Sequence, residues 1–370
     1  MKTNKIILII AGEASGDLHG AGLMREMLQI NSSIKFIGLG GPKMEKLGLQ
    51  SLAPIKKLAV MGFWEVAKSL VFFFKLKKKI LQTIFISKPD QIILIDYPGF
   101  NLSIAKAVKK KLHIPIFYYI SPQLWAWKEK RINLIKKYID KMIVVFPFEK
   151  DWYKERGVKV KYFGHPIIET KEQYIFSALN YKESINVALC PGSRLQEVER
   201  HMPVLREFIK KYKPASNQTM NFYIIKAPNI EERLLQKHIK NVNVKIVDQP
   251  ILEVFQKCHF GIVASGTASL ESAITTRPLV VIYKMSWVSW YITKRFVKIP
   301  FACIVNILAN KKIIPELLQT DLNIQNLTAV LDGFFNKASQ KNYKETINRV
   351  INDLGDGNVY KKTAQYILNK

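Results

Sequence analysis

The sequence predicts an α/β protein of two doubly wound, Rossmann-like halves that face each other across a cleft. Short runs of β-branched residues alternate with longer amphipathic stretches, which is typical of parallel sheets covered by helices. The alternation stops near Gly164-His165-Pro166 and restarts near residue 185. A chain of 370 residues also suits two domains better than one. We therefore expect a site in the cleft, at the carboxyl ends of both sets of strands.

The elements repeat in the two halves. In the first half we expect strands over 5–11, 34–38, 91–96, 115–120, 141–146 and 160–163, with helices over 17–29, 63–83, 101–112 and 128–138. In the second half we expect strands near 185–190, 221–226, 243–247, 260–264 and 278–283, with helices near 197–212, 251–257 and 267–275. These elements define an N-terminal domain over 1–166 and a C-terminal domain over 185–340. Apolar residues at helical spacing make 341–370 a helical segment, which we expect to pack back on the N-terminal domain.

The net charge of +28 points to anionic partners. Nucleic acid, acidic lipid headgroups and phosphorylated substrates all fit this charge, as does a lysine-rich solvated surface. The sequence has no zinc-finger or RNP-type pattern, so we expect no nucleic-acid partner.

The cysteines and apolar runs indicate the compartment. The three cysteines lie far apart and form no CxxC pair, which disfavours disulfides and a metal site and favours a reducing compartment. The run Ile6–Ala11 imitates a signal peptide, but it is short and enters a polar turn, so a first buried strand is the better interpretation. No stretch reaches the ~18 uncharged apolar residues of a spanning helix. We expect a cytoplasmic protein that at most lies on a membrane.

The first strand is followed by a glycine-rich loop from Gly12 to Gly20. Its spacing is not GxGxxG, and Glu13, Asp17 and His19 stand where a pyrophosphate would bind, so a dinucleotide site is disfavoured. These three residues are candidates for catalysis on a hydroxyl-rich ligand. The alternative is an ordinary strand-to-helix turn with Asp17 as the helix cap.

A second catalytic candidate is Asp96, at the expected carboxyl end of the third strand. A carboxylate there is well placed to act as a general base on an acceptor hydroxyl. The alternative is that Asp96 only caps the turn that Pro98 and Asn101 shape. The later segment Ser121–Lys128 carries two tryptophans, a pattern more typical of packing than of ligand binding.

Two loops of the second half fit a nucleotide. Pro191-Gly192-Ser193-Arg194 follows a strand and offers a guanidinium for phosphate. Ser265-Gly266-Thr267-Ala268 exposes amides at the start of a helix, a setting that favours anions. Glu271, one turn into that helix, suits hydrogen bonds from ribose hydroxyls.

Two stretches combine aromatic and basic residues as interfacial helices do. The first, over 60–80, includes Phe63, Trp64, Phe73 and Phe74, and the second, over 285–301, includes Trp287 and Trp290. A core helix with a solvated basic edge is the alternative for each.

Six segments of the chain together resemble the lipid-A-disaccharide synthase family. In the family's order they are AGEASGD at 11–17, SPQLWAW at 121–127, PFEKDWY at 147–153, GHP at 164–166, PGSRLQEVE at 191–199 and SGTASLE at 265–271. The resemblance implies the two-lobed GT-B fold and an inverting transfer without metal or cofactor. UDP-2,3-diacylglucosamine and 2,3-diacylglucosamine 1-phosphate would give lipid A disaccharide 1-phosphate and UDP, at the inner face of the cytoplasmic membrane.

The resemblance also bears on single residues. It adds Asn306 to the donor-site candidates, because Val305–Leu308 is similar to a Pro-Asn-Leu-Leu stretch of the family. Members commonly carry a second aspartate where this chain has Gly99, so either Asp96 or a side chain of the first loop would be the base. The alternatives are another GT-B enzyme, such as an epimerase, and a membrane-associated structural protein. Association as a homodimer is left open.

Overall fold

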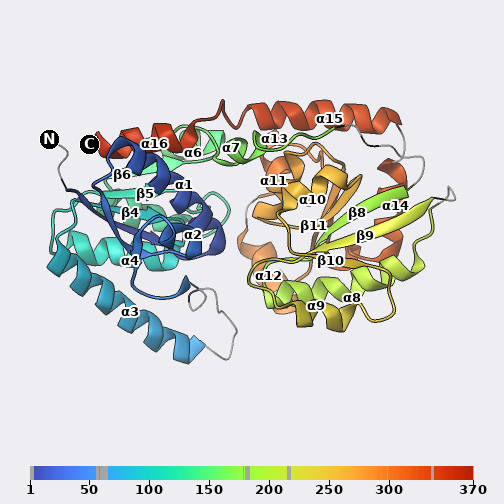
Figure 1. Ribbon diagram of the computed structural model, residues 1–370, viewed down its shortest axis with the longest axis horizontal. Helices are drawn as coiled ribbons and strands as arrows, with labels where there is room; N and C mark the ends of the chain where they lie inside the picture. Colours follow the sequence, from blue (N-terminus) through green and yellow to red (C-terminus); the bar gives the residue numbers. More distant parts are fainter. Residues whose placement is uncertain are drawn as a thin grey trace. The chain divides into compact units, whose positions relative to one another are not determined.

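The structure is a computed structural model that describes residues 4–55, 58, 66–177, 179, 184–214, 218–297, 299–334 and 337–369. It divides into two compact units (Figure 1). Unit 1 comprises Met1–Pro166 and Gly355–Lys370, and unit 2 comprises Ile167–Leu354. Each unit is a parallel sheet covered by helices, which confirms the expected fold class.

Unit 1 is built on seven parallel strands, counted over the described residues, in the order β3-β2-β1-β4-β5-β6-β7. The strands are β1 (Ile6–Ala11), β2 (Lys35–Leu39), β3 (Leu49–Ser51), β4 (Gln91–Ile95), β5 (Ile116–Tyr119), β6 (Lys141–Val144) and β7 (Val160–Tyr162). The helices are α1 (Ala14–Ile30), α2 (Pro42–Glu45), α3 (Val66–Ser87), α4 (Pro98–Lys109), α5 (Ile132–Tyr138), α6 (Pro147–Glu155) and α16 (Val359–Leu368).

The central strands of unit 1 are continuous apolar runs because helices cover both faces of the sheet. In β4 all five residues are buried, as are the last five of the six residues in β1. Leu8, Leu94 and Tyr118 belong to a core that α3, α4 and α5 complete on one face. Helices α1 and α16 lie side by side within the unit (Figure 1).

The last sixteen residues are joined to unit 1 through close packing of α16 on α1. The ring of Tyr360 lies so close to Gly22 that a Cβ there would be 2.4 Å from the tyrosine Cζ. The Tyr360 hydroxyl also lies 2.9 Å from Nδ1 of His19. The preceding helix, α15, belongs to unit 2, so the two ends of the expected 341–370 segment lie in different units.

Unit 2 repeats the arrangement with six parallel strands among its described residues, in the order β10-β9-β8-β11-β12-β13. These are β8 (Ser184–Cys190), β9 (Thr219–Ile225), β10 (Lys245–Val247), β11 (Phe260–Ala264), β12 (Leu279–Tyr283) and β13 (Glu316–Leu318). Its helices are α7 (Ile167–Lys171), α8 (Leu195–Lys211), α9 (Glu232–His238), α10 (Ile251–Lys257), α11 (Thr267–Ala273), α12 (Trp287–Phe296), α13 (Ile304–Ala309), α14 (Ile324–Phe334) and α15 (Lys337–Asn352).

The strand order reverses at one point in each sheet. The reversal lies between β1 and β4 in unit 1 and between β8 and β11 in unit 2. In open α/β sheets ligands bind outside the carboxyl ends of the strands at such a switch point. The loops after these four strands are therefore where the chemistry of each unit is expected.

Candidate functional site

The switch point of unit 1 brings together the loop after β1 and the loop after β4. The ring of Tyr97 lies against Gly12, where a Cβ would be 2.4 Å from the tyrosine Cγ. The next residue, Glu13, precedes α1, and its backbone oxygen accepts a hydrogen bond from the Asp17 amide at 2.9 Å. Glycine is therefore required at position 12 for the two loops to meet.

Asp96 follows β4 in a left-handed backbone conformation that few side chains favour. Its φ is +43° and that of Tyr97 is +50°. The buried Asn101 donates its amide to the Asp96 carbonyl at 2.7 Å, and the Tyr118 hydroxyl donates to the same oxygen. Strained backbone that is held in place by its surroundings is concentrated at functional sites.

The environment of Asp96 holds its carboxyl ready to exchange a proton near neutral pH. Burial raises the pKa of Asp96 to about 7, and the negative charges of Glu13 and Glu149 act in the same direction. A hydrogen bond from the Tyr97 backbone offsets part of this rise. A general base works best when its pKa lies near the working pH, and Asp96 therefore stays a candidate for that role.

Gly99 stands where members of the family that this sequence resembles commonly carry a second aspartate. Gly99 lies in the first turn of α4, and a Cβ built there would meet nothing within 4 Å. The site thus has room for the carboxylate that the family resemblance leads one to expect.

The carboxylate of Asp17, a catalytic candidate from the sequence, holds a neighbouring loop. One oxygen accepts hydrogen bonds from the amides of Gly41 and Met44 at 2.8 and 3.0 Å, and the other from Lys43 at 3.1 Å. The side chain is buried. Asp17 therefore caps α2. The alternative interpretation of the sequence placed this cap on the helix that follows the first strand.

His19, another catalytic candidate from the sequence, contacts the C-terminal helix. Its ring is buried, and its Nδ1 is hydrogen-bonded to Tyr360 of α16. Burial lowers the pKa of His19 to about 4, far below that of an efficient base at neutral pH. His19 anchors the C-terminal helix to unit 1.

Glu149 is a buried residue that the sequence argument did not single out, although it stands within PFEKDWY. One oxygen accepts hydrogen bonds from the Ser121 hydroxyl at 2.5 Å and the Trp125 indole at 3.1 Å. The other accepts from the amides of Val145 and Phe146. Burial raises the pKa of Glu149, and these donors oppose the rise. Glu149 thus joins SPQLWAW to the start of α6.

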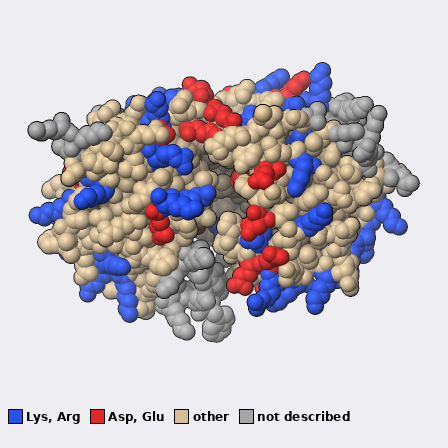
Figure 2. Space-filling view, viewed as in Figure 1, with Lys and Arg blue, Asp and Glu red and all other residues tan. Residues whose placement is uncertain are grey.

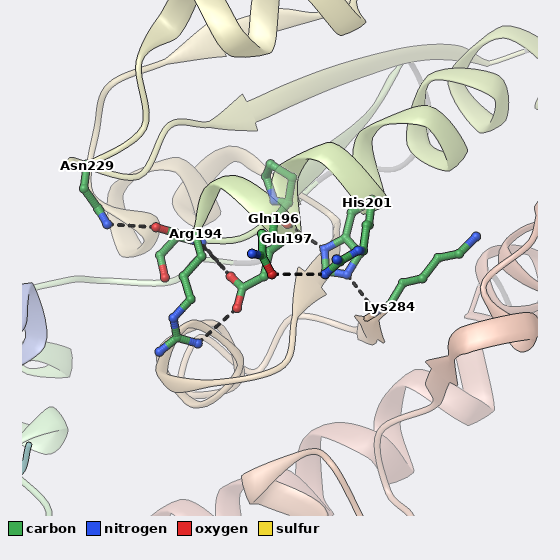
Figure 3. Close-up of polar contacts among 9 residues, drawn as sticks. Arg194, Gln196, Glu197, His201, Asn229 and Lys284 are labelled. Carbon is green, nitrogen blue, oxygen red and sulfur yellow. Dashed lines mark hydrogen bonds and ion pairs between the residues drawn. The ribbon is translucent and has the colours of Figure 1, made fainter. Parts of the chain in front are cut away.

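In unit 2 the first candidate loop runs from Pro191 to Arg194 between β8 and α8 (Figure 3). The buried Glu197 accepts hydrogen bonds from the amides of Ser193 and Arg194 and contacts the Arg194 guanidinium at 3.1 Å. Asn229 donates to the Ser193 carbonyl at 2.8 Å. The Arg194 side chain is nonetheless 65% exposed, so its charge is presented at the edge of a fixed loop.

The second loop, after β11, lies across the switch point from the first. The Ser265 hydroxyl donates to the Ala302 carbonyl at 2.7 Å, and the exposed Gly266 has a φ of +136°. Thr267 begins α11, Ala268 follows, and Glu271 is half-buried with a pKa that burial raises to about 7. Because α11 has only seven residues, its dipole is a weaker aid to anion binding than expected.

Asn306, a donor-site candidate from the family resemblance, lies among backbone groups of unit 2. It is fully buried, and its amide nitrogen donates to Ile314 and Glu316 while its oxygen accepts from Ile313 and Ile314. The Glu316 carboxylate also accepts from the amide of Ala302. Asn306 therefore supports the backbone beneath Ser265.

The expected lipid-contact residues divide into exposed and packed groups. Trp287 is 69% exposed and Phe74 73% exposed, whereas Trp290 is half-buried. Phe73 is half-buried and packs its ring against Phe100. Phe63 and Trp64 lie outside the described residues.

No helix within the described ranges is both long and apolar enough to cross a membrane. No group of three or more His, Cys, Asp or Glu residues in the same ranges is arranged to hold a metal ion.

The fold and its two switch-point sites define a GT-B type protein, and solved structures agree. S. aureus MnaA with UDP aligns with a TM-score of 0.65 at 14% identity, covering 99% of this chain and 97% of that one. The UDP-GlcNAc 2-epimerase of Neisseria meningitidis bound to UDP-GlcNAc aligns with a TM-score of 0.60 at 15% identity, covering 99% of this chain and 100% of that one. At these identities the likeness concerns the fold alone.

The sequence comparisons are more specific. The model of the lipid-A-disaccharide synthetase family matches residues 7–369. Lipid-A-disaccharide synthase 1 of Legionella pneumophila (strain Paris) is 39% identical over 353 residues, which are 93% of this chain and 91% of the relative. The synthase of Anaeromyxobacter dehalogenans (strain 2CP-C) is 33% identical over 372 residues, 98% and 96% of the two chains. The chain belongs to the lipid-A-disaccharide synthase family, an enzyme family of hexosyltransferases.

Proposed function

We propose that this protein condenses UDP-2,3-diacylglucosamine with 2,3-diacylglucosamine 1-phosphate to give lipid A disaccharide 1-phosphate and UDP, with inversion at the anomeric carbon. The observation that carries this proposal is the family match over nearly the whole chain. The side chains at the two switch points supply the groups that such a reaction requires, a base in one unit and an anion-binding loop in the other.

In unit 1, Asp96 accepts the proton of the acceptor 6-hydroxyl. The hydroxyl oxygen forms the new bond to the anomeric carbon of the donor from the face opposite UDP. The bond from that carbon to the phosphate oxygen breaks, and its electron pair leaves with UDP. Glu13 raises the pKa of Asp96 through its charge, which makes the Asp96 carboxylate a stronger proton acceptor.

In unit 2, Arg194 and the loop Ser265–Thr267 bind the diphosphate and stabilise the charge that develops as it leaves. Fixed donors aimed at a developing charge contribute because they need no reorganisation during the reaction. Glu197 and Asn229 fix the Arg194 loop in advance. Glu271 accepts hydrogen bonds from the ribose hydroxyls.

The reaction is tested by incubating the purified protein with the two diacyl substrates in buffer free of divalent metal. We expect UDP release only when donor and acceptor are both present, together with a disaccharide product. UDP release or epimerisation of the donor without acceptor would instead favour another UDP-sugar enzyme of this fold.

Asp96→Asn tests the base, because asparagine tolerates the left-handed backbone that position 96 requires. We expect kcat/KM to fall by about 10²–10⁴-fold. In the unsubstituted protein kcat/KM should decline as the pH falls below about 7, where Asp96 takes up a proton, and the residual activity of the variant should lack this decline.

Stability measurements separate this effect from misfolding. The pKa of Asp96 is raised in the folded state, so its charge disfavours folding above pH 7, and Asp96→Asn should not lower Tm at pH 8. The matched control is Asp151→Asn, at an exposed position of α6 in the same unit. If Asp96→Asn retained full activity, another group would be the base.

Arg194→Ala tests the electrostatic role of the guanidinium. We expect kcat to fall on the order of 10²-fold, because the positive charge is needed most when the diphosphate departs. Arg233→Ala, at an exposed position of α9 in the same unit, is the control and should be close to unsubstituted activity. Near-normal kcat in Arg194→Ala would contradict the assignment.

We further propose that the protein works on the cytoplasmic membrane surface through α12. This helix carries four exposed apolar or aromatic side chains: Trp287 (69% exposed), Val288 (72%), Tyr291 (75%) and Phe296 (64%). It also carries Lys294 and Arg295. A surface hollow of about 580 Å³ is lined by residues of α12. On the face shown in Figure 2, Lys and Arg lie on both units among Asp and Glu. The net charge of +28 favours attraction to an anionic surface.

Vesicle sedimentation tests this membrane contact. Replacing Trp287 and Tyr291 together by serine should lower binding to vesicles containing phosphatidylglycerol by about 10-fold or more, because two aromatic side chains lose their burial in lipid. Ile175→Ser is the control, at a position that is 82% exposed in the same unit but outside α12. Equal loss in both variants, or retention on duplex DNA in preference to vesicles, would contradict the proposal.

A further inference from the structure

His201 is a fully buried histidine in α8 that the proposed reaction does not use. Its two ring nitrogens contact backbone groups of two different loops (Figure 3). Nε2 accepts a hydrogen bond from the Lys284 amide at 2.8 Å. Nδ1 must then carry the proton and donate it to the Pro191 carbonyl, 2.6 Å away. The ring is therefore neutral, and burial favours this form by lowering its pKa.

The two loops that His201 joins are not connected by the hydrogen bonds of the sheet. Pro191 follows β8 and begins the Arg194 loop, whereas Lys284 follows β12. Strand β11 lies between these two strands in the sheet. His201 reaches past β11 from α8 and connects the carboxyl ends of β8 and β12 directly.

One helical turn earlier, α8 also holds the Arg194 loop through Glu197. Residues four apart lie on the same face of a helix, so Glu197 and His201 present one polar edge to the strand ends. Glu197 accepts hydrogen bonds from the amides of Ser193 and Arg194, and His201 donates to Pro191. The position of this loop is thus set by α8.

The segment on the other side of His201 leads into the aromatic helix α12. The Met285 amide, next to Lys284, donates to Oε1 of the buried Gln319 at 2.9 Å. The Ser286 hydroxyl then caps α12 by accepting a hydrogen bond from the Ser289 amide. Two buried side chains, His201 and Gln319, therefore fix Lys284 and Met285, the two residues that precede the N-cap Ser286 of α12.

We propose that His201 is a positioning residue that holds α12 against the Arg194 loop, so that unit 2 binds a ligand carrying both a diphosphate and acyl chains. The diphosphate lies at Arg194, and the acyl chains lie along the aromatic face of α12. This inference rests on the proposed function, and it makes α12 the part of unit 2 that contacts the acyl chains of the donor.

Two substitutions of His201 separate its two hydrogen bonds. His201→Asn keeps a donor near the Nδ1 position but loses the acceptor for Lys284. His201→Gln keeps an acceptor near the Nε2 position but loses the donor to Pro191. Gln319→Met keeps the buried volume and removes the acceptor for Met285, and it serves as a second variant of the same segment if His201→Asn does not fold.

The measurements are the Kd values of UDP and of UDP-2,3-diacylglucosamine, determined by calorimetry. His201→Asn and Gln319→Met should weaken binding of the acylated donor by about 10-fold and change the affinity for UDP less than about 3-fold. The reason is that a buried amide loses its hydrogen-bond partner, so that α12 shifts. His201→Gln should weaken the binding of both ligands alike, because it releases the Arg194 loop at which both diphosphates lie. His238→Asn, in α9 of the same unit, is the control and should change neither.

Equal effects of His201→Asn and Gln319→Met on the two ligands, or no effect on either, would overturn the positioning role. If the unsubstituted protein binds the acylated donor no more tightly than UDP, the contact between acyl chains and α12 is refuted, even where the protein still transfers sugar. If the unsubstituted protein neither binds nor uses the acylated donor, the proposed function itself fails.

Discussion

The parallel sheet is the constraint on which the rest of the structure depends. Helices cover both faces of each sheet, so the strands are apolar and leave little room for polar chemistry between them. All strands of a parallel sheet have their carboxyl ends at the same edge, and the loops that follow them present polar groups there. In both units the loops at the reversal of strand order carry the candidate residues, Asp96 in unit 1 and Arg194 in unit 2.

Buried polar side chains then hold these loops in place. Five buried side chains accept hydrogen bonds from backbone amides of neighbouring segments: Asp17, Glu149, Glu197, His201 and Asn306. A buried backbone amide without a partner costs more than a hydrogen bond contributes when formed. Each of these side chains therefore determines where a loop lies, and the exposed groups beside them bind or react.

The fold could be predicted from the sequence because it depends on local patterns. The strands and helices were found where apolar runs and helical spacing placed them, for example β11 and α10. The short elements β3, α2 and β13 have only three or four residues, too few to show a period. The Arg194 and Ser265 loops could be recognised because their glycine and polar residues directly follow a strand.

The structural roles of Asp17 and His19 could not be predicted because they depend on partners elsewhere in the chain. Sequence shows that Asp17 is a carboxylate in a polar loop, but its hydrogen-bond partners lie at Gly41–Met44. The partner of His19 is Tyr360, 341 positions away. Glu149 escaped notice for the same reason, since its partners Ser121 and Trp125 belong to another loop.

Hydrogen exchange in the presence and absence of UDP tests most directly which unit binds the donor nucleotide. With UDP bound, amides of 190–201 and 264–271 should exchange more slowly, because these loops bind the diphosphate and the ribose. The loop 12–20 of unit 1 should be unaffected by UDP alone. Protection confined to 12–20, with no change at 190–201, would contradict the assignment of the donor nucleotide to unit 2.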